Sequence, residues 1–308
     1  MKRYMIGRIG KAIFTIWFIV TVVFICTRLT GDPTNWLLPD DASEIVRAEL
    51  RETLGLNRPI WIQYLDSVIA LGKGDLGKSY TYLRPVDELF RERLFPTLSL
   101  GFIAFNLSIF WGIALGVFTA VCHDTILDKM LTGISVMFDA VPGFVMGILL
   151  IFLCSLKLKL LPSGGIGTRG ILNYIMPVLT LAIGPTVKIA RLTRSSLLDV
   201  LEIEYIECAI AKGSSWIQAI LKHGLRNALI PVVTMIGLQL GTIIGGSVVV
   251  ETVFAWPGIG SLIVTAAQTR DFPVVQYGVL LIASGVTITN LLVDISYGFL
   301  DPRIRDKE

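Results

Sequence analysis

Charged side chains are scarce in this sequence. Asp, Glu, Lys and Arg make up 17% of the 308 residues, below the roughly 25% usual for soluble domains, while hydrophobic residues make up 53%. This composition argues against a soluble domain and predicts an integral membrane protein in a lipid bilayer. The net charge is only +3 and no basic patch alternates with aromatic residues, so we expect no nucleic-acid binding.

The sequence also lacks the residue patterns of enzymes and metal sites. Its four cysteines lie inside or beside apolar runs and have neither disulfide nor zinc-ligand spacing. Its two histidines lie at loop edges without a matching carboxylate or nucleophile. We therefore expect no catalytic residue, no metal ion and no cofactor, and we expect that the chain is not an enzyme.

Six apolar segments can cross a membrane as helices, which takes about 20 residues, or somewhat fewer where flanking Lys and Arg side chains extend outward to the interface. They are residues 12–27, 97–122, 130–156, 171–187, 228–250 and 274–293. The sequence therefore predicts an all-α membrane protein with six transmembrane helices in one domain, residues 1–308. No small-residue cleavage site follows the first segment, which favours a retained helix over a secretory signal.

The basic residues of the short loops predict the orientation. They gather at the N-terminus (Lys2, Arg3, Arg8, Lys11), in the loop 188–228 and in the tail (Arg303, Arg305, Lys307). We therefore expect both termini and the loop 188–228 on the cytoplasmic side, with residues 31–95 as an external loop region. The bias is moderate, because the opposite loop around Lys157, Lys159 and Arg169 is also basic.

Residues 72–79 match the phosphate-binding pattern G-x-x-x-x-G-K-[ST] in full. Such a loop binds phosphate when a strand precedes it and a helix follows, because backbone N–H groups then converge on the anion. Here residues 61–71 predict an amphipathic helix before the loop, and Pro85 follows soon after it. The expected topology also places the loop outside, away from ATP. We interpret the match as a coincidence.

Two features of the apolar segments are candidates for function. Gly237, Gly241 and Gly245 recur every four residues and share one helix face, which lets another helix approach closely, either as plain packing or as a sliding contact. Asp139, beside Pro142, is an ionisable group within an apolar segment. It lines a polar pathway or is a hydrogen-bonded structural group near the membrane boundary.

The polar segment between the fourth and fifth apolar segments is the most informative part of the chain. Residues 204–212 and 214–231 each show a helical pattern, and Gly213 separates them. A glycine permits a turn there that costs other residues free energy. A membrane protein with little aqueous mass has few places where a partner can exert force, and this segment is a good candidate.

This segment resembles the EAA loop of ABC importer permeases, with Glu207, Cys208 and Ala209 in the positions of Glu-Ala-Ala and Gly213 as the glycine that follows. Over nearly its whole length the chain resembles the B-type permeases of dipeptide, oligopeptide and nickel importers. The matching residues are 31–33, 54–59, 63–64, 74–77, 79, 191–196, 223–231, 251–260, 270–273 and 301–303. The lookalike of the phosphate loop overlaps the matches at 74–77 and 79, so the resemblance implies that it is an external family segment.

Two positions depart from the general permease pattern. Cys208 replaces the first alanine, a change that its small size should allow. Arg226 stands where many permeases have proline, thirteen residues after the glycine, and proline comes only at Pro231. That shift resembles the B-type subgroup.

The resemblance implies a type I ABC importer permease of the bacterial inner membrane, forming half of a translocation pathway for peptides or a similar small solute. The implied partners are a homologous second permease, two cytoplasmic ABC ATPase subunits and an external, periplasmic solute-binding protein. The residues expected to couple to the ATPases are Glu207, Ala209, Gly213, His223, Arg226, Asn227 and Pro231. The residues expected along the pathway are Asp139, Gly237, Gly241 and Gly245.

Two other functions compete with this one. A secondary transporter that works without ATPases would show inverted repeats and broken helices around midplane charges, and the sequence shows neither clearly. A membrane-bound enzyme would need a reactive group of residues, which we do not find. The substrate stays open among dipeptides, oligopeptides, glutathione, nickel and others, because the binding protein carries most of the specificity.

Overall fold

The computed structural model describes residues 2–29, 31–39, 41–167 and 170–300, and the regular elements among them are helices. They are α1 (Lys2–Leu29), α2 (Thr34–Leu37), α3 (Glu44–Thr53), α4 (Ile60–Gly72), α5 (Val86–Val121), α6 (Ile126–Ala140), α7 (Gly143–Leu150), the π-helical η1 (Ile151–Lys157), α8 (Leu172–Leu201), α9 (Glu204–Ala211), α10 (Trp216–Gln218), the π-helical η2 (Ala219–Gly224), α11 (Leu225–Val253), α12 (Ile259–Gln268) and α13 (Phe272–Leu300). Arg169 and the basic tail 301–308 lie outside the described residues.

Five continuous helical stretches in the described residues are long and apolar enough to cross a membrane. They are 6–29 of α1, α5, α8, the continuous stretch from α10 to α11, and 272–295 of α13. A sixth span is broken, since α6 and the α7–η1 helix meet at an angle of 102°. The all-α fold is confirmed, with five candidate spans in the described residues, or six if the bent pair that covers the segment 130–156 is counted as one.

Pro142 explains the break in the third span. The residue before a proline is disfavoured in helical conformation, and Val141 is indeed extended, with φ −87° and ψ 123°. Pro142 then lies at the start of α7, where its missing N–H costs nothing. The helix axis therefore changes direction between Ala140 and Gly143.

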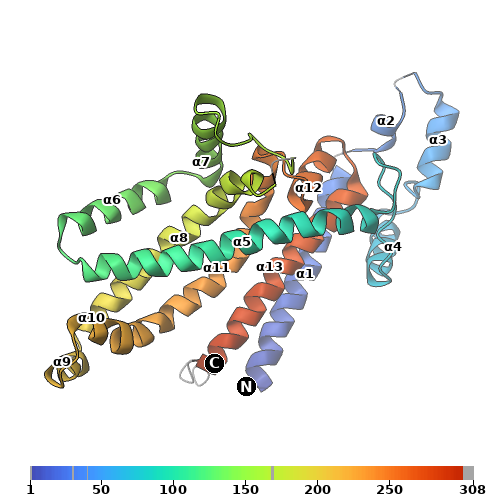
Figure 1. The fold of residues 1–308 in the computed structure, drawn as a ribbon. Coiled ribbons are helices and arrows are strands. Elements are labelled where there is room, and N and C mark those ends of the chain that lie inside the picture. Colours follow the sequence, from blue (N-terminus) through green and yellow to red (C-terminus); the bar gives the residue numbers. More distant parts are fainter. Residues whose placement is uncertain (1, 30, 40, 168–169, 301–308) are drawn as a thin grey trace.

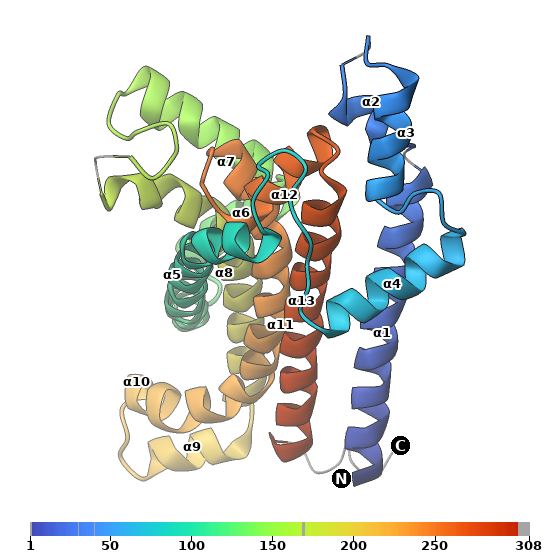
Figure 2. The same ribbon diagram turned by 90° about the vertical axis from the view of Figure 1, so that its right-hand side faces the viewer.

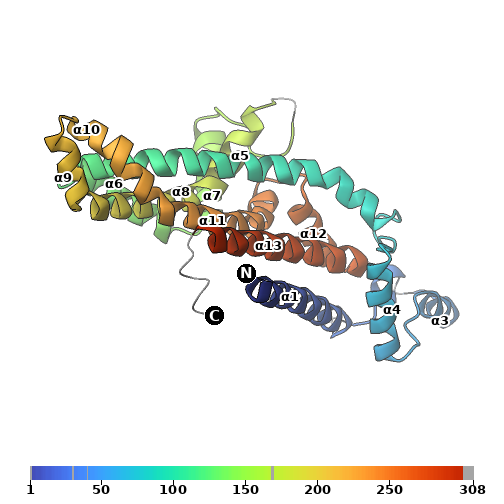
Figure 3. The ribbon, with the colours of Figure 1, turned by 90° about the horizontal axis from the view of Figure 1, so that it is seen from below.

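The long helices lie side by side, with α9 and α10 at one end of the molecule and α2, α3 and α12 at the other (Figures 1 and 2). We call these the α9 end and the α12 end. The start of α1 and the end of α13 lie at the α9 end (Figure 2). Seen from below, α1 runs along α13, and α5 crosses the bundle beside α8 and α11 (Figure 3).

Glycines bring α5 close to α8. A Cβ atom on Gly112 would lie 2.6 Å from Cγ2 of Ile189, and one on Gly116 would lie 2.6 Å from the carbonyl oxygen of Ala190. Both distances are too short for real atoms, so only glycine allows this approach. The α5–α8 pair is the most extensive helix contact of the chain.

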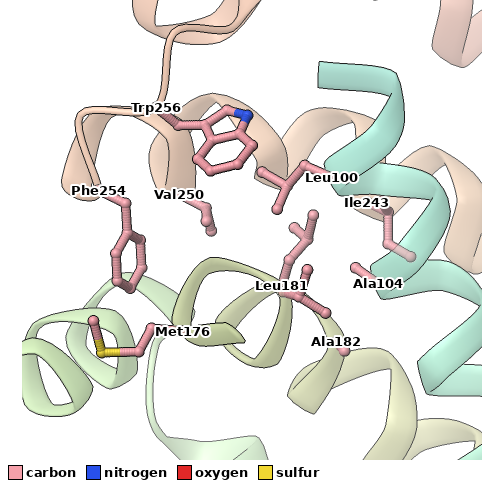
Figure 4. Packing of buried hydrophobic residues seen from close by; sticks show 10 residues of the cluster. Leu100, Ala104, Met176, Leu181, Ala182, Ile243, Val250, Phe254 and Trp256 are labelled. Atoms are coloured by element: carbon pink, nitrogen blue, oxygen red, sulfur yellow. The ribbon is translucent and has the colours of Figure 1, made fainter. Parts of the chain in front are cut away.

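The main apolar core lies toward the α12 end, where α5, α8 and α11 converge (Figure 4). Trp256, just after α11, is fully buried, and its ring meets that of Tyr174 edge to face at a centroid distance of 4.5 Å. Its indole Nε1–H donates to the carbonyl oxygen of Pro96 at 3.1 Å, so the polar end of the ring is satisfied. This core holds the α11–α12 corner against the two long helices.

Candidate functional site

The segment around Gly213 forms a sharp elbow at the α9 end. Helix α9 ends in a Schellman motif, because Gly213 N–H donates to Ile210 O at 2.9 Å and Ser214 N–H donates to Ala209 O at 3.1 Å. Gly213 has a φ of +94°, in the left-handed region that side chains disfavour. No atom of the described residues would come within 4 Å of a Cβ there, so the backbone conformation alone requires glycine.

The chain returns toward the membrane through a second capped helix. The Ser215 hydroxyl accepts from Gln218 N–H, and the Gln218 side chain accepts from Ser215 N–H, which forms a capping box. The π-helical η2 follows and leads directly into α11. Ile220 on η2 is fully buried in a cluster with Leu197 of α8 and Ala228 of α11, so the elbow is anchored to the spanning helices.

The elbow exposes both polar and large apolar side chains. Glu207 and Cys208 on α9 are exposed and Ala209 is half-buried, whereas Ile206 is buried and holds α9 in place. The large apolar side chains exposed around the elbow are Ile203, Ile210, Trp216, Ile217 and Leu221. Several large apolar side chains exposed close together in the sequence of a polar segment are typical of a protein contact.

The remaining residues expected to couple lie where η2 enters α11. His223 is half-buried at the end of η2, and Arg226 and Asn227 are exposed in the first turn of α11. Pro231 is exposed inside α11, where it removes one donor from the helical hydrogen-bond ladder. The structure thus places all seven predicted coupling residues in one short stretch at the α9 end.

Asp139 lies at the end of α6 and pairs with Arg191 on α8, with 3.2 Å between Oδ2 and Nη1. A second pair links the start of α6 to α8, where the Arg194 guanidinium donates twice to Asp128, at 2.8 and 2.7 Å. The Asp128 side chain is only 4% exposed, whereas that of Asp139 is 33% exposed. The sequence reasoning identified Asp139 and missed Asp128, whose partner is 66 residues away.

The three glycines of α11 do not share one neighbour. A Cβ on Gly237 would lie 2.8 Å from Val293 of α13, and one on Gly241 would lie 3.2 Å from Asn290 Oδ1. No described atom lies within 4 Å of such a Cβ on Gly245. Two of the three therefore serve packing within this chain, and only Gly245 faces open space.

A buried carboxylate organises the α12 end. Glu251 is fully buried and accepts from Thr97 Oγ1 at 2.7 Å, from Gly260 N–H at 2.6 Å and from Ser261 N–H at 3.2 Å. A Cβ on Gly258 would collide with this carboxylate. These donors replace water around the charge, which stabilises the α11–α12 corner. Sequence reasoning missed this site, because its donors come together only in the fold.

The lookalike of the phosphate loop is held by another buried carboxylate. Asp271 accepts from the Ser79 hydroxyl and from the N–H groups of Tyr80 and Thr81, both at 3.1 Å. Helix α4 rather than a strand precedes the loop, and α5 begins only at Val86. Within the loop, the Ser79 hydroxyl donates to Asp271, Gly77 N–H donates to Asp75 Oδ1, and the N–H groups of Gly74 and Ser79 donate to backbone carbonyl oxygens. These donors are therefore occupied within the chain, which supports the interpretation of a coincidental match.

Comparisons with known proteins identify the family. Residues 112–306, more than half of the chain, match the family described as "Binding-protein-dependent transport system inner membrane component". The chain is 39% identical over 308 residues to the glutathione transport system permease protein GsiC of Salmonella typhimurium and to that of Escherichia coli K12, covering 100% of each sequence.

A solved structure shows the same fold. A chain of the inward-facing MetNI methionine ABC transporter is 20% identical, with a TM-score of 0.55, covering 69% of this chain and 96% of that one. The type I permease fold is therefore confirmed, and the family excludes the secondary transporter and the membrane-bound enzyme. The chain belongs to the binding-protein-dependent inner membrane components and is a non-catalytic permease subunit of an ABC importer.

Proposed function

We propose that the elbow of α9, Gly213 and α10 is the site through which two cytoplasmic ABC ATPases drive this permease. The observation that carries the proposal is the Schellman turn at Gly213, which presents the exposed carboxylate of Glu207 beside exposed apolar side chains. A carboxylate in such a position forms a charge-assisted hydrogen bond with a basic residue of the ATPase. The apolar side chains around it supply the buried contact area.

Force applied to the elbow reaches the membrane through α8 and α11. The cluster of Leu197, Ile220 and Ala228 joins the elbow to both helices, and interlocked packing of this kind transmits displacement. ATP-driven approach of two ATPases draws two such elbows together. The pathway then alternates between states that face opposite sides of the membrane.

We propose that the α9 end is cytoplasmic and the α12 end external. The basic residues of the N-terminal segment and of the loop 188–228 gather at the α9 end, in agreement with the positive-inside rule. The region 31–95, with α2 and α3 at the α12 end, is then the docking surface for the periplasmic solute-binding protein. Both termini are cytoplasmic in this orientation.

The pathway itself needs a second, homologous permease. Only 6% of the apolar membrane-spanning part of α1, and 11% of that of α13, is buried within the chain. Both helices therefore leave extensive apolar surface for lipid and for another subunit. An added Cβ on Gly245 would meet no described atom, and a cavity lies between α6 and α8 near Asp139, so these parts of the predicted pathway leave space within this chain. We assign these two parts to the lining of the pathway. We assign Gly237 and Gly241 to the packing of α11 against α13.

For the transported solute we propose a small peptide of the glutathione type. The support is the full-length similarity to glutathione transport permeases, at 39% identity without uncovered segments. Glutathione is a γ-glutamyl tripeptide with two carboxylates, one ammonium group and one thiol. The solute-binding protein carries most of the selectivity, and the permease accepts related peptides.

The variant Gly213→Pro tests the coupling role. Proline lacks the N–H that bonds to Ile210 and cannot adopt a φ of +94°, so it destroys the turn while leaving the spanning helices untouched. We expect ATP-dependent uptake of glutathione to be lost in cells that produce the complete transporter, with normal abundance of the chain in the membrane. Glu207→Lys should also weaken uptake, because it places a like charge against the ATPase.

Gly133→Ala is the matched control. Gly133 lies inside α6 with an ordinary helical backbone, and within the part of the chain that the structure describes no atom lies within 4 Å of an added Cβ. Its replacement should leave uptake and abundance unchanged. Normal uptake by Gly213→Pro would remove Gly213 from the coupling site, whereas loss of uptake in both glycine variants would show a general sensitivity of the helices.

A further inference from the structure

A cavity of about 830 Å³ opens between α5, α6 and α8, with Met235 of α11 at its edge. Pockets that hold small molecules commonly measure roughly 300–1,000 Å³, so this space suits a solute the size of a tripeptide. It lies in the part of the chain toward the α9 end, where α6 diverges from α5 and α8 (Figure 1).

The cavity lining is mostly apolar and carries a cluster of polar side chains. Apolar side chains come from all three helices and include Trp111 of α5, Phe138 of α6 and Ile183 of α8. The polar cluster includes Thr132 and Ser135 of α6 and Lys188, Arg191 and Arg194 of α8. An apolar surface that carries a cationic cluster suits an amphipathic anion.

Charge in the cavity is unbalanced. Two of the three cations of the lining, Arg191 and Arg194, are paired with carboxylates of α6, Asp139 and Asp128, which lie outside the lining. Lys188 is exposed in addition, which leaves one positive charge in excess among these groups. Walls of low dielectric strengthen such a field and raise the local concentration of anions.

The two ion pairs differ in how firmly they are held. Arg194 donates two short hydrogen bonds to Asp128. The hydroxyl of Thr132 and the backbone N–H of Asp124 donate to the same carboxylate. Arg191 holds Asp139 by a single contact of 3.2 Å, and the Arg191 side chain is 53% exposed. Breaking the second pair therefore exposes both groups to water, while breaking the first would strand a buried charge.

We propose that Arg191 is the subsite for a carboxylate of the transported solute and that Asp139 is its displaceable counter-ion. A guanidinium binds a carboxylate through two parallel hydrogen bonds, which the single contact with Asp139 does not use in full. The carboxylate of the solute replaces that of Asp139 at Arg191. The guanidinium is therefore never left without a counter-ion. This inference rests on the proposed function, since it assumes that the cavity belongs to the translocation pathway.

Cysteine reactivity tests the field at Arg191 without any transport. Ser135 lies one helical turn before Asp139 on α6 and lines the cavity. In the full-length chain with its four native cysteines replaced by serine, Ser135→Cys is placed in lipid nanodiscs. The rates of its reaction with an anionic and a cationic methanethiosulfonate are measured and divided by the rates for a free thiol.

We expect the anionic reagent to react several times faster than the cationic one after this correction. Adding Arg191→Gln should lower that preference by at least about threefold, and adding Asp139→Asn should raise it, because the guanidinium is then freed. Arg191→Lys should keep most of the preference. Lys129→Gln, an exposed cation of α6 outside the cavity lining, should leave it unchanged.

Transport provides the second readout. In cells with the complete transporter, Arg191→Gln should raise the glutathione concentration for half-maximal uptake by about tenfold, the effect of one lost charged hydrogen bond. Uptake of the diamide of glutathione, which lacks both carboxylates, should not respond to this variant. An equal loss for both probes would show that Arg191 acts on the fold and not on the solute.

Three results would overturn the proposal. The first is a reagent preference that is equal in the parent and in Arg191→Gln. The second is a Ser135→Cys thiol that reacts in the isolated chain but not in the assembled transporter, which would assign the cavity to the second permease. The third is the equal loss for both probes. Failure of the parent transporter to import glutathione would instead refute the proposed substrate and leave the cysteine result to decide on Arg191.

Discussion

The guanidinium of Arg194 on α8 donates two hydrogen bonds to the carboxylate of Asp128 on α6, Nε to Oδ1 at 2.8 Å and Nη2 to Oδ2 at 2.7 Å. With Asp128 only 4% exposed, this pair fixes the start of α6 against α8. The distant end of α6 is held by the looser pair of Asp139 and Arg191. One end of α6 is thus anchored firmly and the other end is released easily.

Arg194→Gln should destabilise the chain by about 3 kcal/mol, because it leaves the Asp128 carboxylate buried without its cation. The measurement is the apparent Tm of the purified protein in detergent. Adding Asp128→Asn should recover part of the loss, because the buried charge is then removed too. Arg191→Gln should change the Tm far less, and equal losses in the two arginine variants would contradict the difference between the pairs.

The buried carboxylate of Asp271 should protect the loop after Lys78 from proteolysis. Asp271→Asn weakens the acceptor for Ser79, Tyr80 and Thr81, so the loop opens more often. We expect faster tryptic cleavage after Lys78, detected by mass spectrometry of the fragments. Asp66→Asn, which removes an exposed pair with Arg58, is the control and should leave that cleavage rate unchanged.

Replacement by alanine should lower the stability at one glycine of the spanning helices and leave it unchanged at another. Gly116→Ala forces a methyl group to within 2.6 Å of the Ala190 carbonyl, so we expect α5 and α8 to separate at a cost of about 1–3 kcal/mol. Gly245→Ala meets no described atom within 4 Å and should leave the Tm of the isolated chain unchanged. A fall in Tm for Gly245→Ala and none for Gly116→Ala would contradict the packing of α5 on α8.

The sequence predicted the spans well, because a membrane requires long apolar helices and those are visible as composition. It misplaced their ends, since α8 continues past the apolar segment to Leu201 and α5 begins at Val86. Helical backbone does not need apolar side chains, and Lys188, Arg191 and Arg194 extend α8 without interrupting it. Pro142 accounts for a bend in the third span, whereas the angle of 102° depends on the packing of α7 in the fold.

The elbow was predictable because its signals are local. Gly213 and the helical patterns on both sides fix the turn through neighbours within five residues. The buried carboxylates of Glu251 and Asp271 were not predictable in the same way, since donors such as Thr97 and Ser79 lie 154 and 192 residues away. In the sequence, both carboxylates appear only within segments that resemble the permease family, and nothing there indicates what they bind.

The orientation of the chain has its own test. A cysteine in place of Lys78, in a chain without native cysteines, should react from outside intact cells or spheroplasts with a thiol reagent that cannot cross membranes. A cysteine in place of Lys212, in the elbow at the α9 end, should react only after the membrane is opened. Labelling with the reverse pattern would invert the proposed topology and remove the elbow from the reach of ATPases.

The central claim is that this chain is half of a pathway and works only with its partners. The most direct measurement is the mass of the intact complex after mild extraction of the tagged chain, together with ATP-dependent uptake by the same preparation in vesicles. We expect a transport-competent species with this chain, one homologous permease and two ATPase subunits, to which a solute-binding protein binds. A transport-competent species that contains this chain alone would contradict the account.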